Sequence, residues 1–438
     1  MSDPQAQLPP GHDGLPVLGE TLRFLGNIFG FVGDGARRHG PVFRSRILGR
    51  RTAVLSGPEA TDAFVDPERV QRSGAMPPNI QTLFGGESLP VLDGAKHRER
   101  KSFVMAAFTR DALAGYVPIL QRSIRAALAD ATTTPKVSCL DAFQHLAIEA
   151  ICEMFIGLKP SAELEEVRED YVLVVRAVAS LPLPLPWSKF ARGKRAVQRI
   201  LAVYAKAIKE HEQGAARTDG LARILSAKVE DKHIDHAALQ RELHHIVIAG
   251  YIVWGWFCTT VIELGENQEL CARLTDEVAK LPADYHLDAV DALPLLRTVS
   301  MEVRRVSPVV PVSFGVAHRD FMLGGYRVPA GWMVLWSPSA SNRAPVFSEP
   351  DRFDPTRFGE SRHEDERHRH AYVPNGGGDA HTGHKCAGHE LASLMLRVFT
   401  IELLRGYRFE LLEGRPSYDS TKIPAEPSDG LPVRFTAK

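Results

Sequence analysis

The sequence of 438 residues contains only five cysteines: Cys139, Cys152, Cys258, Cys271 and Cys386. A small, odd and unpatterned set excludes a disulfide-stapled secreted scaffold and indicates a protein of the reducing cytoplasm. An excess of either charge is also absent, because Lys+Arg and Asp+Glu each number 53. This balance excludes the strongly basic surface of a nucleic-acid-binding protein.

A long apolar run is missing from the N-terminus. Residues 1–14 form a polar leader that contains Pro9 and Pro10, with neither a signal peptide nor a membrane anchor. Gly/Ser-rich linkers, repeats and low-complexity segments are absent as well. Because hydrophobic residues make up 44% of the chain, enough for one large core, we expect residues 1–438 to form a single domain.

A glycine-rich loop that ends in Cys386 is the most informative segment, spanning residues 376–389. An apolar-periodic helix follows it directly, so the helix dipole and free N–H groups there would stabilise a thiolate. Gly388, two residues later, allows a flat ligand to approach the backbone closely. These are the requirements of a cysteine that binds haem iron; a buried structural cysteine in a glycine-rich turn is the alternative.

Two further motifs precede this loop. Glu302 and Arg305 are three residues apart, so on a helix they share a face and can pair. Pro355-Thr356-Arg357-Phe358 comes later. In this order the three motifs resemble the cytochrome P-450 superfamily, and the resemblance covers essentially the whole chain. It implies a mainly α cytochrome P-450 fold, one large helical domain with a small β-rich lobe, and a buried ionic triad of Glu302, Arg305 and Arg357.

Hydrophobic periodicity agrees with this fold. It predicts helices over 97–130, 139–157, 163–180, 192–213, 236–264, 290–306 and 388–406. Strands are predicted as a hairpin over 42–48 and 52–55, and over 313–317, 322–328 and 332–336.

The resemblance also implies haem b as the cofactor, with the Cys386 thiolate as the iron ligand and Gly388 beside it. His97 and Lys101 match the superfamily's motif that reaches a haem propionate, with Arg100 next to them; a solvated basic run is the alternative. His384 replaces an arginine that usually binds the other propionate. Since Gly315 replaces a second such arginine, we expect a rearranged propionate site.

In oxygen-activating members an acid followed by a threonine, in the long helix over the haem, delivers protons to dioxygen. Residues 248–256 contain no Asp, Glu, Ser or Thr, which leaves Tyr251, Ile252 and Val253 at the catalytic position. Tyr251 is the sole hydroxyl there, and ordinary packing is its alternative role. Dioxygen, with NAD(P)H electrons passed through ferredoxin reductase and ferredoxin, and hydrogen peroxide both stay open as oxidants.

Different parts of the chain resemble different branches of the superfamily. The lengthened cysteine loop is similar to that of bacterial fatty-acid peroxygenases, which use hydrogen peroxide, and of plant allene oxide synthases, which rearrange hydroperoxides. The Arg-Pro that anchors a fatty acid in the peroxygenases falls here on Ile248-Ala249. Residues 8–21 instead resemble the sterol- and retinoid-oxidising enzymes.

Four apolar segments predict a pocket for a lipophilic small-molecule substrate: 76–92, 181–187, 251–256 and 309–314. For the His-rich segment 362–370 we expect a solvated loop rather than a metal site. We therefore predict a haem-thiolate oxidoreductase, a monooxygenase or peroxygenase, that oxidises a lipophilic molecule. A hydroperoxide-rearranging enzyme and a catalytically silent haem-binding partner domain in a biosynthetic assembly are the alternatives.

Overall fold

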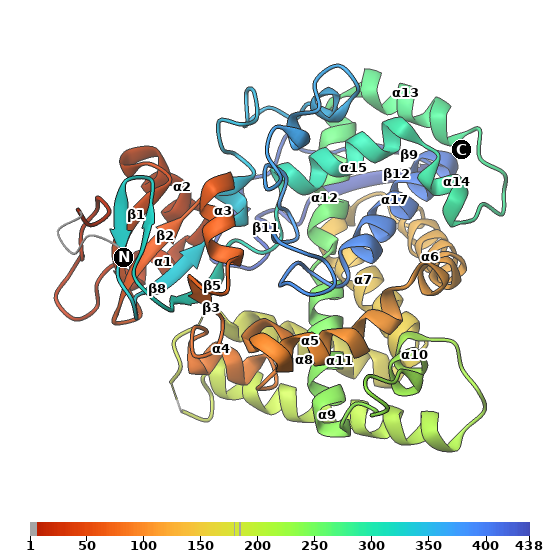
Figure 1. Ribbon diagram of the computed structural model, residues 1–438. Helices are drawn as coiled ribbons and strands as arrows, with labels where there is room; N and C mark the ends of the chain where they lie inside the picture. Colours follow the sequence, from red (N-terminus) through yellow and green to blue (C-terminus); the bar gives the residue numbers. More distant parts are fainter. Residues whose placement is uncertain (1–6, 179, 184) are drawn as a thin grey trace.

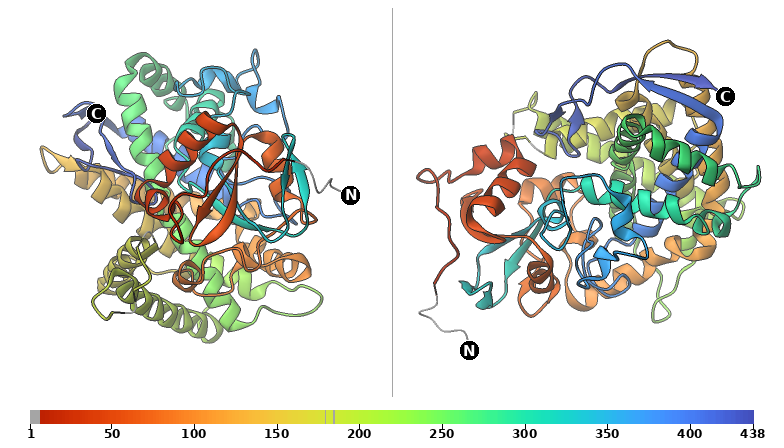
Figure 2. Two further views of the ribbon diagram at one scale, coloured as in Figure 1. Left: turned by 90° about the vertical axis from the view of Figure 1, so that its left-hand side faces the viewer. Right: turned by 90° about the horizontal axis from the view of Figure 1, so that it is seen from above.

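The computed structural model describes residues 7–438 apart from 179 and 184, so residues 1–6 of the predicted leader lie outside it. A helical body makes up most of the molecule, and a smaller β-rich lobe lies at its side, near the N-terminus (Figure 1). Figure 2 shows from above that the lobe projects from this body. The described chain thus has the predicted division into a helical part and a β-rich part.

The helices of the described chain have the following bounds. They are α1 Thr21–Gly26, α2 Ile28–His39, α3 Pro58–Val65, α4 Pro78–Leu83, α5 Gly94–Met105, α6 Arg110–Ala131, α7 Cys139–Ile156, α8 Ala162–Val178, α9 Lys189–Gln213, α10 Gly220–Ser226, α11 His236–Tyr251, α12 Trp254–Glu266, α13 Gln268–Val278, α14 Leu287–Asp291, α15 Pro294–Val306, α16 Pro338–Ser341 and α17 His389–Gly406. Short 3₁₀ turns are η1 Leu89–Val91, η2 Ala106–Phe108, η3 Pro355–Phe358 and η4 Glu364–Glu366.

The centre of the helical core is α12, in which every residue from Trp254 to Leu264 is buried. Phe257 of this helix stacks on Phe399 of α17 at 4.4 Å between ring centroids, and Phe143 of α7 meets both rings edge-on. A helix that is apolar on all sides belongs in the interior. The stretch His236–Glu266 is long and apolar enough to cross a membrane, but 83% of its most apolar window is buried inside the protein.

The β-rich lobe is built on a five-stranded sheet in the order β1-β2-β8-β5-β3. Alternate residues of β2 face opposite sides: Ala53 and Leu55 join one apolar cluster and Val54 joins another. The strands are β1 Val42–Ile47, β2 Arg50–Leu55, β3 Val70–Gln71, β5 Ser313–Ala317 and β8 Met333–Trp336. Outside this sheet lie β4 Val137–Ser138, β6 Phe321–Leu323, β7 Tyr326–Val328, β9 Tyr407–Leu411, β10 Tyr418–Asp419, β11 Glu426–Pro427 and β12 Pro432–Ala437.

Two predicted elements, besides the long helix over 236–264, are wrong in extent. The single helix expected over 97–130 is two helices, α5 and α6, because Thr109 is extended and caps α6 by accepting from the Ala112 N–H. The two helical stretches meet at 49°. The strand expected over 322–328 is a hairpin, because Gly324 and Gly325 adopt φ +57° and +83° and reverse the chain between β6 and β7.

Candidate functional site

The glycine-rich loop brings Cys386 to the start of α17. The Cys386 N–H donates to the Asn375 carbonyl at 3.0 Å, which closes the base of the loop, and the Gly388 N–H donates to the sulfur. Burial raises the pKa of the Cys386 thiol, although that N–H and nearby cations act to lower it. Since a bound metal ion deprotonates a coordinating thiol, the sulfur is placed to serve as a ligand.

Lys101 holds this loop through hydrogen bonds to its backbone. Its side chain is buried, and Nζ donates to the carbonyls of Gly383 and Lys385, the latter at 2.7 Å. Burial lowers the pKa of Lys101 to about 8, against the raising effect of Cys386. The structure thus uses this cation, predicted at a propionate, to position the backbone just before the cysteine.

His97, His384 and Arg72 lie together beside the loop. The rings of His97 and His384 are 4.0 Å apart between centroids, and His384 Nε2 is 3.6 Å from Asp93 Oδ1. The buried Arg72 guanidinium lies 3.5 Å from the centre of the Phe64 ring. Burial lowers the pKa of His97 to about 3 and that of Arg72 to about 9. At pH 7 Arg72 is therefore the charged member of this partly buried cluster, and His97 is a neutral imidazole.

Arg72 fits a haem propionate better than any contact it makes within the chain. Its guanidinium donates to the carbonyls of Phe314 and Phe64 at 3.3 and 3.4 Å, and the charge of Asp93, which accepts from the Arg72 backbone N–H, acts to raise its pKa. Burial of a cation is costly unless it is paired directly, and a propionate in contact with the guanidinium would pair with it. A Cβ built on Gly315 would lie 3.4 Å from Arg72 Nη1. Gly315 stands where the superfamily usually has a propionate-binding arginine. Arg72 lies beside Gly315 and therefore places a guanidinium on the same side of the site.

Arg100 is not brought into this group. Its Nη1 donates to Glu242 Oε1 at 3.1 Å, and the fully buried Glu242 also accepts from the Leu89 N–H at 3.1 Å. One carboxylate of α11 thereby ties α5 and η1 to the long helix. Glu242 was missed because its partner is 142 positions away in the chain.

The long helix predicted over 236–264 is interrupted at Ile252–Val253, between α11 and α12. The Val253 N–H donates to the Gly250 carbonyl at 3.3 Å, and the Trp256 N–H donates to the Val253 carbonyl at 2.9 Å. Both are three-residue bonds of the 3₁₀ type, which often mark a functional position within a helix. The predicted catalytic residues Tyr251, Ile252 and Val253 therefore lie at this break.

The hydroxyl groups near the break are engaged elsewhere or buried against other helices. Tyr251 is buried, with its ring 6.3 Å from the Tyr171 ring of α8, and burial raises the pKa of its phenol. Thr259 and Thr260 each donate at 2.9 Å to the carbonyl four residues earlier in α12. These threonines are therefore satisfied within their own helix.

A buried polar network lies on the α8 side of α11. The Tyr171 hydroxyl is 2.6 Å from that of Tyr204 and 3.0 Å from His244 Nδ1, and His244 Nε2 contacts the Leu83 carbonyl at 2.8 Å. Burial lowers the pKa of His244 to about 4, so the imidazole is neutral at pH 7. The network links α4, α8, α9 and α11.

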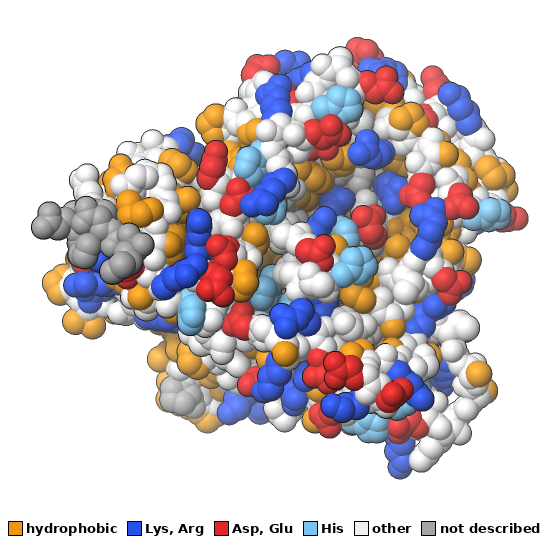
Figure 3. All heavy atoms as spheres, in the orientation of Figure 1, with side chains coloured by type: hydrophobic (Ala, Val, Ile, Leu, Met, Phe, Trp, Pro, Cys, Tyr) orange, Lys and Arg blue, Asp and Glu red, His pale blue; other side chains and the backbone are white. Residues whose placement is uncertain are grey.

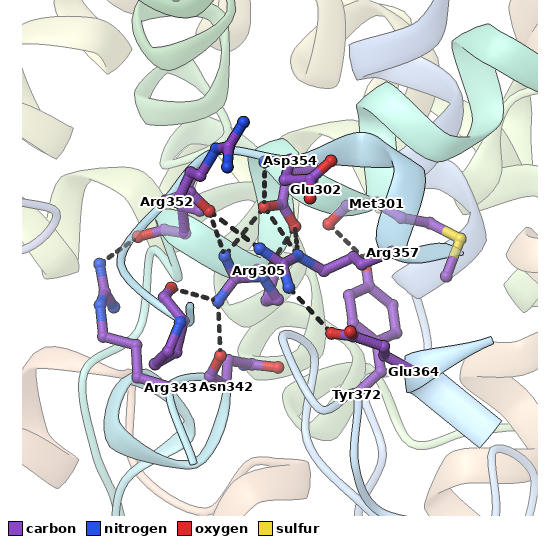
Figure 4. A network of polar contacts seen from close by, with 12 residues as sticks. Met301, Glu302, Arg305, Asn342, Arg343, Arg352, Asp354, Arg357, Glu364 and Tyr372 are labelled. Atoms are coloured by element: carbon purple, nitrogen blue, oxygen red, sulfur yellow. Dashed lines mark hydrogen bonds and ion pairs between the residues drawn. The ribbon is translucent and has the colours of Figure 1, made fainter. Parts of the chain in front are cut away.

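Glu302, Arg305 and Arg357 form the network drawn in Figure 4. Glu302 accepts from Arg305 Nε at 2.7 Å and from Arg357 Nε at 3.1 Å, and all three side chains are fully buried. Glu364, missed by sequence reasoning, binds Arg357 Nη1 from the other side at 2.9 Å. The buried triad that the resemblance implies is thus present, with a fourth member.

Two other sequence predictions concern the apolar segment 181–187 and the His-rich segment 362–370. Leu181, Leu183, Leu185 and Trp187 are 51%, 48%, 43% and 74% exposed, so the described part of 181–187 lies at the surface; residue 184 lies outside the described chain. In the His-rich segment His370 is buried rather than solvated. It accepts from the Gly378 N–H at 3.0 Å and faces Asp62 at 2.7 Å. Among the described residues no cluster of metal-ligating side chains occurs, there or elsewhere.

Comparison with known proteins gives a match to the family model described as cytochrome P-450, over residues 9–427. The chain belongs to the cytochrome P-450 family. Its P-450 fold, its character as an oxidoreductase of the monooxygenase or peroxygenase kind and its thiolate-bound haem b are thereby confirmed.

Several relatives are similar along their whole length. Cytochrome P-450 26A1 of Danio rerio is 27% identical over 99% of this chain and 91% of the relative. Putative cytochrome P-450 120 of Synechocystis sp. is 27% identical over 98% and 96%. The solved structure of retinoic acid bound cyanobacterial CYP120A1 superposes with a TM-score of 0.91 at 26% identity, covering 99% of this chain and 100% of that chain.

A second solved structure shares the fold at greater distance. Cytochrome P-450SP alpha (CYP152B1) in complex with (R)-ibuprophen has a TM-score of 0.82 at 24% identity, covering 97% of this chain and 99% of that one. The cyanobacterial CYP120A1 of the first structure has retinoic acid bound, and the present chain is a haem-thiolate enzyme.

Proposed function

We propose that this cytochrome P-450 oxidises an elongated lipophilic molecule of the retinoic acid type, with Cys386 as the axial ligand. The substrate class is supported by the retinoic acid bound relative, which is similar to this chain over nearly its whole length. It is supported further by the apolar, buried character of Trp254 and Trp256 next to the helix break. We also propose that residues 1–438 act as one cytoplasmic domain.

Each polar residue around the loop has a separate role in this proposal. Haem bound through a thiolate supplies the centre at which an O–O bond is cleaved, aided by electron donation from sulfur. The Gly388 N–H bonds the sulfur and Lys101 holds the preceding carbonyls, so the ligand keeps one orientation. Arg72, as a cation, and the imidazoles of His97 and His384, as hydrogen-bond donors, receive the propionates.

The oxidant follows from the missing proton relay, which is the observation that carries this proposal. The break at Ile252–Val253 presents no acid or hydroxyl, and the nearest threonine hydroxyls are bonded within α12. Dioxygen needs two electrons and two protons before its O–O bond can break, whereas hydrogen peroxide needs only one proton moved between its oxygens. Water, the substrate or Tyr251 would move that proton. We therefore propose that peroxide supports turnover at least as well as ferredoxin and NADPH.

The test is parallel turnover of the holoenzyme with hydrogen peroxide and with a ferredoxin, ferredoxin reductase and NADPH system. Retinoic acid, a fatty acid and a lipid hydroperoxide serve as substrates, and binding is followed by the change in haem spin state. Peroxide-supported oxidation equal to or above the reductase-supported rate is expected. Tightly coupled NADPH-driven oxidation would refute the proposed use of peroxide.

Two variants locate the effect at the break. Ile252→Asp with Val253→Thr adds the acid–alcohol pair and should raise the fraction of NADPH recovered in product. Val253→Ala is the matched control, because it alters volume at the same position without adding a hydroxyl. Conversion of the hydroperoxide without added oxidant would favour the rearranging enzyme. Absence of both binding and turnover would favour the silent partner domain.

A further inference from the structure

The buried imidazole of His370 joins the β-rich lobe to the glycine-rich start of the cysteine loop. Its Nδ1 lies 2.7 Å from Asp62 Oδ1 of α3, and its Nε2 accepts from the Gly378 N–H at 3.0 Å. Helix α3 lies at the edge of the lobe that faces the helical body (Figure 1). On the face seen in Figure 3, histidine and charged side chains gather along this junction.

The two contacts of His370 fix the tautomer of its ring. A backbone N–H can only donate, so Nε2 carries a lone pair and the ring proton lies on Nδ1, where the Asp62 carboxylate accepts it. Burial lowers the pKa of His370, although the hydrogen bond to Asp62 acts to raise it. Burial acts to raise the pKa of Asp62, but hydrogen bonds from Arg369 and His370 lower it. A charged Asp62 thus holds a neutral His370 in the tautomer that can bind Gly378.

The start of the cysteine loop packs closely against this imidazole. A Cβ built on Gly377 would lie 2.5 Å from Thr61 Cγ2 and 3.2 Å from His370 Cδ2. Gly378 adopts φ +87°, which other residues rarely do, and a Cβ there would lie 3.4 Å from Val65 Cβ. The contact with α3 and His370 therefore favours glycine at both positions.

The anchored segment leads to the iron ligand. Asn375 lies three residues before Gly378, and its carbonyl accepts the Cys386 N–H at 3.0 Å. Gly376, between them, lies against the other limb of the loop, since a Cβ there would be 3.6 Å from the His384 carbonyl oxygen. A displacement of Gly378 would therefore move the backbone acceptor that orients Cys386.

We propose that His370 is a positioning residue for the iron ligand and that Asp62 holds it in the required tautomer. His370 acts through the Gly378 N–H and the Asn375 carbonyl rather than on the sulfur itself. The position of α3 in the β-rich lobe is thereby transmitted to the thiolate that binds the haem.

Two substitutions of similar size separate the two contacts of His370. The side-chain amide of glutamine reaches the place of Nε2, so His370→Gln keeps an acceptor for the Gly378 N–H and loses the bond to Asp62. The amide of asparagine reaches the place of Nδ1, so His370→Asn keeps a donor for Asp62 and loses the bond to Gly378. The holoenzymes are compared by hydrogen exchange of the Gly378 amide, by the iron–sulfur stretching frequency in resonance Raman spectra and by the reduction potential.

In His370→Asn we expect the Gly378 amide to exchange about tenfold faster, the effect of losing one hydrogen bond, and the stretching frequency and potential to shift with it. His370→Gln should match the wild type in the last two measurements and keep the amide protected. Asp62→Ala leaves the loop side of the contact unaltered but frees the tautomer, so it should show the changes of His370→Asn to a smaller extent. It also keeps the test decisive if His370→Asn yields no holoenzyme.

His363→Asn is the matched control. His363 belongs to the same His-rich segment, its side chain is 47% exposed and lies 3.4 Å from Glu366, and asparagine tolerates its φ of +40°. It should leave all three measurements unchanged. Equal shifts in His370→Gln and His370→Asn would make His370 a structural tie only, and an unshifted stretching frequency and potential in His370→Asn and Asp62→Ala would likewise overturn the proposal.

Discussion

Replacing Glu302 by alanine should destabilise this protein more than removing any exposed carboxylate. Glu302 is fully buried and accepts from Arg305 Nε and Nη2 at 2.7 and 2.9 Å and from Arg357 Nε at 3.1 Å. It also accepts from the Asp354 N–H at 2.7 Å. The substitution removes all of these acceptors at once.

The size of the effect follows from what each arginine keeps. Arg357 retains Glu364 at 2.9 Å, whereas Arg305 retains only backbone carbonyls among the described residues. Stranding one buried charge costs about 3–5 kcal/mol. The Asp354 N–H loses its acceptor too, so we expect a loss near the upper end, about 5 kcal/mol. Since folded proteins have a total stability of about 5–15 kcal/mol, little soluble holoenzyme should be recovered.

Urea unfolding of the holoenzyme, followed by circular dichroism and by the Soret band, measures this loss. Glu302→Gln keeps one acceptor oxygen and should lie between wild type and Glu302→Ala, which leaves a measurable variant if the alanine form does not fold. Glu349→Gln is the control, because Glu349 is exposed on the same network and lies 3.3 Å from Arg352; it should change the free energy of unfolding by about 0.5 kcal/mol or less. Normal haem content in Glu302→Ala, with a loss below about 1 kcal/mol, would contradict the reasoning.

Three further predictions concern single residues. Cys386→Ala should abolish the red-shifted Soret band of the reduced, carbon-monoxide-bound protein. Retention of that band would refute the assignment of Cys386 as the iron ligand. Arg100→Ala should lower the free energy of unfolding by about 3 kcal/mol, because it leaves Glu242 buried without its cation. The folded fraction should still bind haem at the wild-type ratio. Loss of haem would instead support the predicted contact between Arg100 and a propionate. Glu364 is buried, which alone would raise its pKa, but hydrogen bonds from Arg362, Ser348 and Arg357 lower that pKa to about 2. Its contribution to stability is therefore present above pH 4.5 and is lost as the pH falls toward 2, so Glu364→Gln should flatten the dependence of unfolding free energy on pH in that window.

The sequence by itself determined the parts of this protein that are local in the chain. The apolar period of 388–406 and the preceding glycines identified the cysteine loop, and α17 begins at His389. Glu302 and Arg305 pair because they are three residues apart on α15, so their contact needs no knowledge of the fold. Strands β5 and β8 followed from composition and turn signals in the same way. Arg357 was placed by resemblance to the family rather than by its spacing.

Only the tertiary structure decided which distant groups meet. Arg72 follows β3, and the pairing of β3 with β5 brings its guanidinium to the carbonyl of Phe314, 242 positions away in the chain. No pattern in the sequence around Arg72 predicts this contact. Arg100 of α5 binds Glu242 because the fold brings this carboxylate of α11, 142 positions away, within 3.1 Å. The helix break at Ile252–Val253 likewise lies inside an unbroken apolar run. Periodicity reports which face of a segment is apolar, but the partner of a buried charge depends on which elements the fold brings alongside it.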